Sequence, residues 1–187
     1  MKLKSICWLM FFTITFLPAV TSPVWADASD VPLTTYQAKS GAFSLPLPSG
    51  WSVQEDSVIE GYKIPLIAYR PSTGAGDTFQ DNMNVTLEPL PSGATASDYL
   101  VASIKVMAKS LTHMKVLKTG PLQGGFPGAR YMIYTHQTGF PEKLQVVAFF
   151  FTSNSKGYVL SCTSTAVHFD KFFPLYWKVG RGFAPGK

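Results

Sequence analysis

Cysteine is scarce in this chain, and short catalytic or metal-binding motifs are absent from it. Its two cysteines are Cys7 and Cys162, and Cys7 lies in an apolar N-terminal run that we expect to be removed. A single remaining cysteine excludes an internal disulfide framework and zinc sites built from paired cysteines. The sequence also has no Gly-x-Ser-x-Gly, His-Glu-x-x-His or phosphate-binding glycine motif. The usual signatures of α/β-hydrolases, zinc peptidases and nucleotide-binding loops are therefore missing.

Charged residues are also few. They make up 14% of the 187 residues, against 46% hydrophobic and 14% aromatic residues. This composition excludes an intrinsically disordered chain, because it supplies enough apolar surface for a packed core. No repeat of about 20 to 50 residues is visible, which excludes a solenoid. The length fits one domain with a short tail.

The N-terminus has the pattern of a secretory signal peptide over residues 1–26. Lys2 and Lys4 precede an apolar run at residues 6–20, which is shorter than the ~20 residues that a membrane-spanning helix needs. Ala26 ends a short cleavage pattern. No pair of arginines precedes the run, so we expect export by the general secretion route to the periplasm or the cell exterior. An uncleaved membrane anchor is the alternative.

The chain that follows the leader is mildly basic. Removal of Lys2 and Lys4 lowers the formal net charge from +5 to +3, which does not indicate binding to nucleic acid. We divide this part into an N-terminal arm at residues 27–42 and a single domain at residues 43–187. A domain of this size can bury enough surface to be stable without disulfides.

Alternating apolar and polar residues predict a series of β-strands. Residues 43–47 alternate and contain Pro46, which predicts an edge strand. Residues 146–151 are apolar throughout, which predicts a central strand covered on both faces. The other expected strands begin near residue 51 or cover residues 64–69, 83–87, 115–119, 129–136, 144–152 and 158–165.

Two segments have the periodicity of a helix. Over residues 96–113 apolar residues recur at steps of three and four, and Thr95 or Ser97 can cap the first turn. Residues 169–179 form a second expected helix, which Pro174 either kinks or divides. The order of strands, helix, strands and helix predicts the α+β class, with a largely antiparallel sheet.

Candidate residues for catalysis are isolated in the sequence. His113, His136 and His168 are far apart, so an enzyme site would have to assemble from them in space. Cys162 alternates with polar neighbours in an expected strand, which predicts a buried thiol. We therefore predict no catalytic residue and no cofactor, and keep an enzyme of unrecognised type as an alternative.

One loop is rich in oxygen ligands. Asp77 and Asp81, followed by Asn82 and Asn84, are residue types that bind calcium. Their spacing is not that of a calcium-binding loop, and no glutamate closes it. A solvated turn is therefore the favoured interpretation, with Asp77 and Asp81 as weak candidates for a cation site.

The densest positive charge lies in and after the first expected helix. A solvated helix face explains it most simply, and the alternative is a surface that binds an acidic protein or anionic lipids. Each lysine near an anionic membrane contributes only ~1 kcal/mol, so such a contact would be weak and sensitive to salt. The cluster consists of Lys105, Lys109, His113, Lys115 and Lys118.

Four aromatic residues lie within six positions of the second expected helix. One helix stripe that packs on a sheet does not need so many, so we expect one or two of them to be partly exposed and accessible to a partner. They are Phe172, Phe173, Tyr176 and Trp177.

Several of these segments together resemble the PsbP-like superfamily. The similar segments are Phe43-x-Leu45-x-Leu47-Pro48-x-Gly50-Trp51, then Asp81-Asn82-Met83-Asn84-Val85, Tyr99-Leu100 at the first helix, and Gly157-Tyr158-Val159-Leu160-Ser161-Cys162-Thr163 before the aromatic helix. The resemblance covers residues 43–183, and it lies more in the order and spacing of the segments than in any one of them.

This resemblance implies an α/β/α sandwich around an antiparallel sheet. Phe43, Pro48, Gly50 and Trp51 are then structural residues, with Trp51 in the core beside a turn set by Pro48 and Gly50. The resemblance also implies a non-enzymatic binding or accessory role, in which the protein docks onto a larger protein partner or an envelope assembly. The alternative is a secreted effector that contacts host proteins or anionic membrane lipids through the basic helix face.

Overall fold

A computed structural model describes residues 30–59, 61–74, 77–137 and 139–186. The expected signal peptide at residues 1–26 lies outside the described residues. In the described part of the chain, neither helix combines the length and apolar character needed to cross a membrane.

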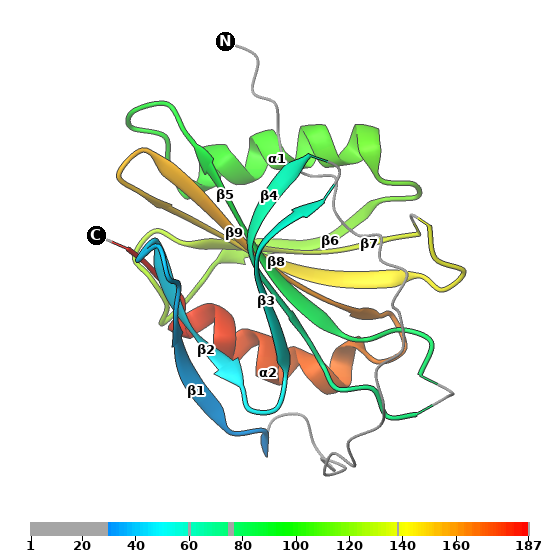
Figure 1. Ribbon diagram of the computed structural model, residues 1–187. Helices are drawn as coiled ribbons and strands as arrows, with labels where there is room; N and C mark the ends of the chain where they lie inside the picture. The colour runs from blue at the N-terminus through cyan, green and yellow to red at the C-terminus, as the bar shows by residue number, and fades with distance from the viewer. Residues whose placement is uncertain (1–29, 60, 75–76, 138, 187) are drawn as a thin grey trace.

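A central sheet of seven strands forms the middle layer of the fold (Figure 1). Its strands lie in the order β3-β4-β5-β9-β8-β7-β6, and every pairing is antiparallel. β3 and β6 are therefore the two edges. The strands are β3 (Ser52–Ile59), β4 (Tyr62–Tyr69), β5 (Asn82–Pro89), β6 (Lys115–Pro121), β7 (Arg130–His136), β8 (Leu144–Ser153) and β9 (Lys156–Thr165).

The two helices lie on opposite sides of this sheet. α1 (Ala96–Ser110) covers one side over β7 and β8, and α2 (Phe169–Gly182) covers the other over β8 and β9. A second sheet, formed by β1 (Leu33–Gln37), β2 (Phe43–Pro48) and β10 (Ala184–Pro185), lies on the side of α2. The predicted α+β class and the sandwich with a central antiparallel sheet are confirmed.

The apolar pattern of β8 explains why the core has two halves. Successive side chains of a strand project to opposite faces of a sheet. Val146, Ala148 and Phe150 accordingly pack in the cluster beneath α1, whereas Val147 and Phe149 pack in the cluster beneath α2. The prediction that this strand is covered on both faces is confirmed.

The start of α1 follows from a capping box. Thr95 Oγ1 accepts a hydrogen bond from the Asp98 backbone N–H at 3.2 Å, and Asp98 Oδ2 accepts one from the Thr95 N–H at 3.0 Å. These bonds satisfy backbone groups that a helix end leaves without partners. Of the two predicted caps, Thr95 is the one that the structure uses.

Two details of the expected N-terminal region are wrong. The arm contains a strand, β1, because residues 33–37 pair with β2 although their own periodicity is weak. β2 is an edge only in part, since Phe43 and Ser44 also pair with β10, whereas Pro46 has a partner in β1 alone among the described strands. Proline is tolerated there because its missing N–H faces no second strand.

The structural residues implied by the resemblance differ in burial. Phe43 is fully buried and stacks on Phe183, with ring centroids 5.6 Å apart. Gly50 adopts a φ of 82°, which favours glycine, in the turn where the Trp51 N–H donates to Pro48 O. Trp51 packs against the core but stays partly exposed, so it does not fill the core as expected.

Candidate functional site

The predicted basic cluster is divided between two sides of the central sheet. On α1, buried residues such as Tyr99, Ser103 and Met107 face the sheet, and Lys105 and Lys109 are exposed. His113 is exposed in the turn that follows, with a φ of 53°. This part of the cluster lies on the α1 side.

Lys115 and Lys118 lie on the other side of the sheet. The register places Lys115 opposite Thr135 and Lys118 opposite Ile133 on β7, and a β-bulge between Val116 and Lys118 lets these two lysines, three positions apart, share one face. Ile133 packs against the core half beneath α2, and Thr135, two positions along the strand, shares its face. The expectation of a single basic face is therefore not met, because strand register separates Lys115 and Lys118 from Lys105 and Lys109.

Exposed apolar residues accompany these lysines, and sequence analysis missed them. Val101 on α1 is 48% exposed, and Val116 and Leu117 on β6 are 37% and 47% exposed. Two signals in the sequence were available. One is a valine four positions before Lys105 on the polar helix face, and the other is a pair of consecutive apolar residues in an expected strand. We call Val101, Lys105, Lys109 and the strand β6 the α1–β6 surface.

The two sides of β6 differ in chemistry. Val116 pairs with Tyr134, which belongs to the core half beneath α1, so Val116 lies on the α1 side. Val101 lies across the helix from Tyr99, whose ring packs on Phe150 of β8 and over Gly157 of β9. Val101 thus lies on the exposed side of α1 together with Lys105 and Lys109, so the α1 side combines exposed apolar residues with two lysines, whereas the other side of β6 carries Lys115 and Lys118.

The lysines of this surface have no acidic partners in the described part of the chain. None of the salt bridges among the described residues involves Lys105, Lys109, Lys115 or Lys118. Asp98, the acidic residue of α1, is occupied by the capping box. The positive charge of these lysines is therefore not compensated by described acidic residues, which favours contact with a negatively charged partner.

The oxygen-rich loop contains its own cation. Arg70 binds both predicted carboxylates: Nη2 donates to Asp77 Oδ1 at 2.8 Å, and Nε donates to Asp81 Oδ2 at 2.7 Å. Burial acts to raise the pKa of Asp77, but the hydrogen bonds from Arg70 and Thr73 outweigh it and the pKa falls below its ordinary value. An arginine just before a loop with two aspartates was the signal that sequence analysis did not use.

The three histidines differ in exposure. His113 and His168 are exposed, and His136 is fully buried beside Tyr134, with ring centroids 6.0 Å apart. Burial lowers the pKa of His136 to about 4. Within the described ranges, no group of three or more His, Cys, Asp or Glu side chains is arranged as a metal site.

Cys162 and the aromatic residues of α2 mostly form core. Cys162 is fully buried, and burial raises the pKa of its thiol well above the ordinary value, which makes it a poor nucleophile. Phe172 and Tyr176 are buried, with the Tyr176 hydroxyl donating to Thr163 O at 3.1 Å. Phe173 and Trp177 are half-buried, which confirms that some aromatic residues of this helix reach the surface.

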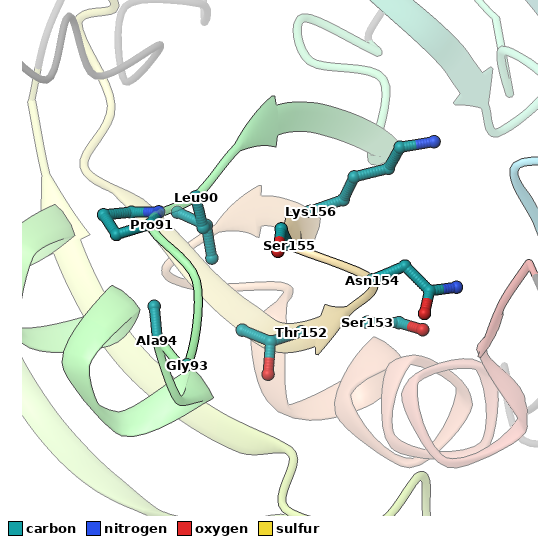
Figure 2. Close-up of a pocket in the computed structure, with 9 residues that line it drawn as sticks. All are labelled: Leu90, Pro91, Gly93, Ala94, Thr152, Ser153, Asn154, Ser155 and Lys156. Atoms are coloured by element: carbon teal, nitrogen blue, oxygen red, sulfur yellow. The ribbon is translucent and has the colours of Figure 1, made fainter.

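A shallow hollow of about 230 Å³ lies between the β5–α1 loop and the β8–β9 hairpin turn. Figure 2 shows Leu90, Pro91 and Ala94 on one side and the turn residues on the other, with the Lys156 ammonium directed away. The Leu90 N–H donates to Ser155 O at 2.8 Å across this junction. The hollow is thus the seam where the loop docks on the hairpin, and its lining indicates no ligand class.

Solved structures with this arrangement of layers decide the fold. CyanoP, the cyanobacterial PsbP of Synechocystis sp. PCC 6803, superposes with a TM-score of 0.58 at 14% identity, over 90% of this chain and 98% of its own. The chain has the PsbP-like fold. No protein-family model and no curated protein matches the sequence.

Other proteins share the PsbP-like fold at similarly low identity. The Ran-binding protein Mog1p of Saccharomyces cerevisiae has a TM-score of 0.58 at 10% identity, over 83% of this chain and 96% of its own. LpqN, which is involved in cell envelope biogenesis of Mycobacterium tuberculosis, has a TM-score of 0.54 at 14% identity, over 84% and 92%. The resemblance inferred from sequence is confirmed at the level of the fold.

Proposed function

We propose that this protein is an exported, non-enzymatic accessory protein that docks onto a protein partner through the α1–β6 surface. The observation that carries the proposal is the combination of exposed Val101, Val116 and Leu117 with lysines that have no acidic partner among the described residues. Apolar residues within a polar rim are typical of protein-binding surfaces, whereas scattered single residues are not.

The fold and the leader support this proposal. Mog1p is a Ran-binding protein and LpqN is involved in cell envelope biogenesis, so the PsbP-like fold is compatible with binding roles, although fold alone does not determine function. The leader pattern at residues 1–26 supports export, and the proposal therefore assigns the partner to the envelope or the cell exterior.

Site-specific photocrosslinking in the producing cells tests the proposal. A photoreactive amino acid at Val116 or Val101 should give an adduct with one defined protein, identified by mass spectrometry. Val58 on the opposite edge strand and Val167 before α2 are more exposed still, at 70% and 88%, and serve as matched control positions. Equal adducts from all four positions, or none from Val116 and Val101, would contradict docking through this surface.

Contact with an anionic membrane is the second candidate function. Lys105 and Lys109 are exposed on α1 and form no salt bridge with any described residue. We expect weak, salt-sensitive cosedimentation with phosphatidylglycerol vesicles if this function operates, and a clear loss in the Lys105→Ala, Lys109→Ala double variant. Unchanged cosedimentation of that variant would exclude the role of the helix face.

A further inference from the structure

β6 ends the central sheet and has a free hydrogen-bonding edge. Its seven residues pair with β7 on one side, and in the described part of the chain no strand pairs with the other side. Six of these residues are exposed, namely Lys115 to Thr119 and Pro121. An edge of this kind offers a row of backbone N–H and C=O groups to which another strand can be added.

The side chains along this edge set conditions on the added strand. Side chains of a strand alternate between the two faces of a sheet, so the residues of an added strand would alternate as well. One set would lie on the face that carries Lys115 and Lys118, and the other on the face that carries Val116. Side chains of the added strand that lie beside the lysines are favoured to be acidic, and those on the opposite face are favoured to be apolar.

We propose that β6 binds an extended segment of a partner protein in which acidic and apolar residues alternate, and that this segment adds an eighth strand to the sheet. The proposal rests on the proposed function and specifies the partner's chemistry at the same surface. Backbone hydrogen bonds supply part of the affinity, and the alternation supplies the specificity.

A second copy of this chain fits the edge poorly. Two β6 strands would bring Lys115 and Lys118 of both copies together, and like charges across a strand pair are destabilising. The other edge, β3, carries Glu55 and Asp56, but Lys39 and Lys63 already neutralise them at 2.8 and 2.9 Å. The lysines that oppose self-pairing are thus the same residues that favour an acidic segment.

A bilayer fits the charge distribution less well than a strand does. A flat anionic surface would have to contact lysines on both sides of the sheet, because Lys105 and Lys109 lie on the α1 side and Lys115 and Lys118 on the other. A single added strand at this edge can contact Lys115 and Lys118 with the side chains on one of its faces and Val116 with the side chains on the other.

Binding of synthetic peptides to the exported protein tests this inference. The probe is a nine-residue peptide that alternates glutamate and valine, and the control peptide has the same composition with the glutamates and valines in two blocks. We expect the alternating peptide to bind at least tenfold more tightly by fluorescence anisotropy. We also expect amide hydrogen exchange to slow selectively over residues 115–121. Equal binding of the two peptides, or protection elsewhere in the chain, would overturn the proposal.

Charge reversal supplies a gain-of-function control. The Lys115→Glu, Lys118→Glu variant should lose at least tenfold in affinity for the glutamate peptide and should gain affinity for a peptide that alternates lysine and valine. The Lys156→Glu, Lys171→Glu variant has the same net charge and alters exposed residues that lie elsewhere, on β9 and α2. It should bind the glutamate peptide more tightly than the β6 variant does, and equal losses would indicate a non-specific charge effect and overturn the proposal.

Two further outcomes separate this inference from the function on which it rests. A defined crosslink at Val116 together with failure of the alternating peptide would leave protein docking intact and reject the added strand. If the protein binds phosphatidylglycerol vesicles through Lys115 and Lys118 but does not bind the peptide, the partner of this edge is a membrane and the added strand is rejected.

Discussion

Arg70 and Asp81 form an almost fully buried ion pair between the end of β4 and the start of β5. The guanidinium Nε donates to Asp81 Oδ2 at 2.7 Å, and the two side chains are 12% and 1% exposed. Arg70 also binds Asp77 and the Pro71 carbonyl, and its guanidinium lies 5.8 Å from the Phe172 ring centroid. This one side chain therefore holds Pro71, Asp77 and Asp81 together and links them to α2.

Replacement of Arg70 should destabilise the fold strongly. Arg70→Met leaves two carboxylates with little exposure and no cation, and loss of one partner of a buried ion pair costs about 3–5 kcal/mol. Urea denaturation gives the free energy of unfolding. Lys63→Met, which breaks the exposed pair with Asp56, should cost less than ~1 kcal/mol. Similar losses in both variants would show that the Arg70 pair is effectively solvated.

His136 should make stability depend on pH between about 6.5 and 4. Its pKa in the folded protein is about 4 because it is buried, against 6.5 for the unfolded chain. The unfolded state binds more protons in this window, so the free energy of unfolding decreases as pH falls, by at most about 1.4 kcal/mol per pH unit. His136→Gln should reduce this slope in urea denaturation at a series of pH values. The exposed His113→Gln serves as the control, and a slope unaltered by His136→Gln would contradict the assignment.

A methyl group at Gly180 should disturb the packing of α2 on the sheet. A Cβ atom at this position would lie 2.6 Å from ring atoms of Phe149, a fully buried residue of β8. Overpacking of this kind costs about 1–3 kcal/mol. Thermal or urea denaturation of Gly180→Ala measures the effect, and Lys171→Ala at an exposed position of the same helix is the control. A neutral Gly180→Ala would mean that the Phe149 ring can move aside.

The cap of α1 should contribute measurably to stability. Thr95→Ala removes the acceptor for the Asp98 N–H and should cost about 0.5–2 kcal/mol. Ser97→Ala, the alternative cap considered from the sequence, should change the free energy of unfolding by less, because Ser97 lies inside the helix and is exposed. The two variants compared by urea denaturation identify the cap, and a larger effect of Ser97→Ala would contradict this assignment.

Local patterns predicted most of the elements of this fold. The three- and four-residue apolar spacing predicted α1, and the continuous apolar run predicted a doubly covered β8, because burial of each element's own apolar face dominates its stability. The same reasoning predicted a buried Cys162 from the alternation of its strand. Pro174 lies within a single continuous helix α2, although the sequence left open a division there.

Features that depend on contacts between distant segments needed the tertiary structure. β1 is a strand because β2 offers it a partner, and Asp77 and Asp81 bind Arg70 because β4 and β5 pair with each other. The sequence by itself determined which residues of β6 and α1 are charged or apolar. Only strand order and register decided that Lys115 and Lys118 lie on one face and Val116 on the other, because the face of a side chain is defined relative to its neighbouring strands.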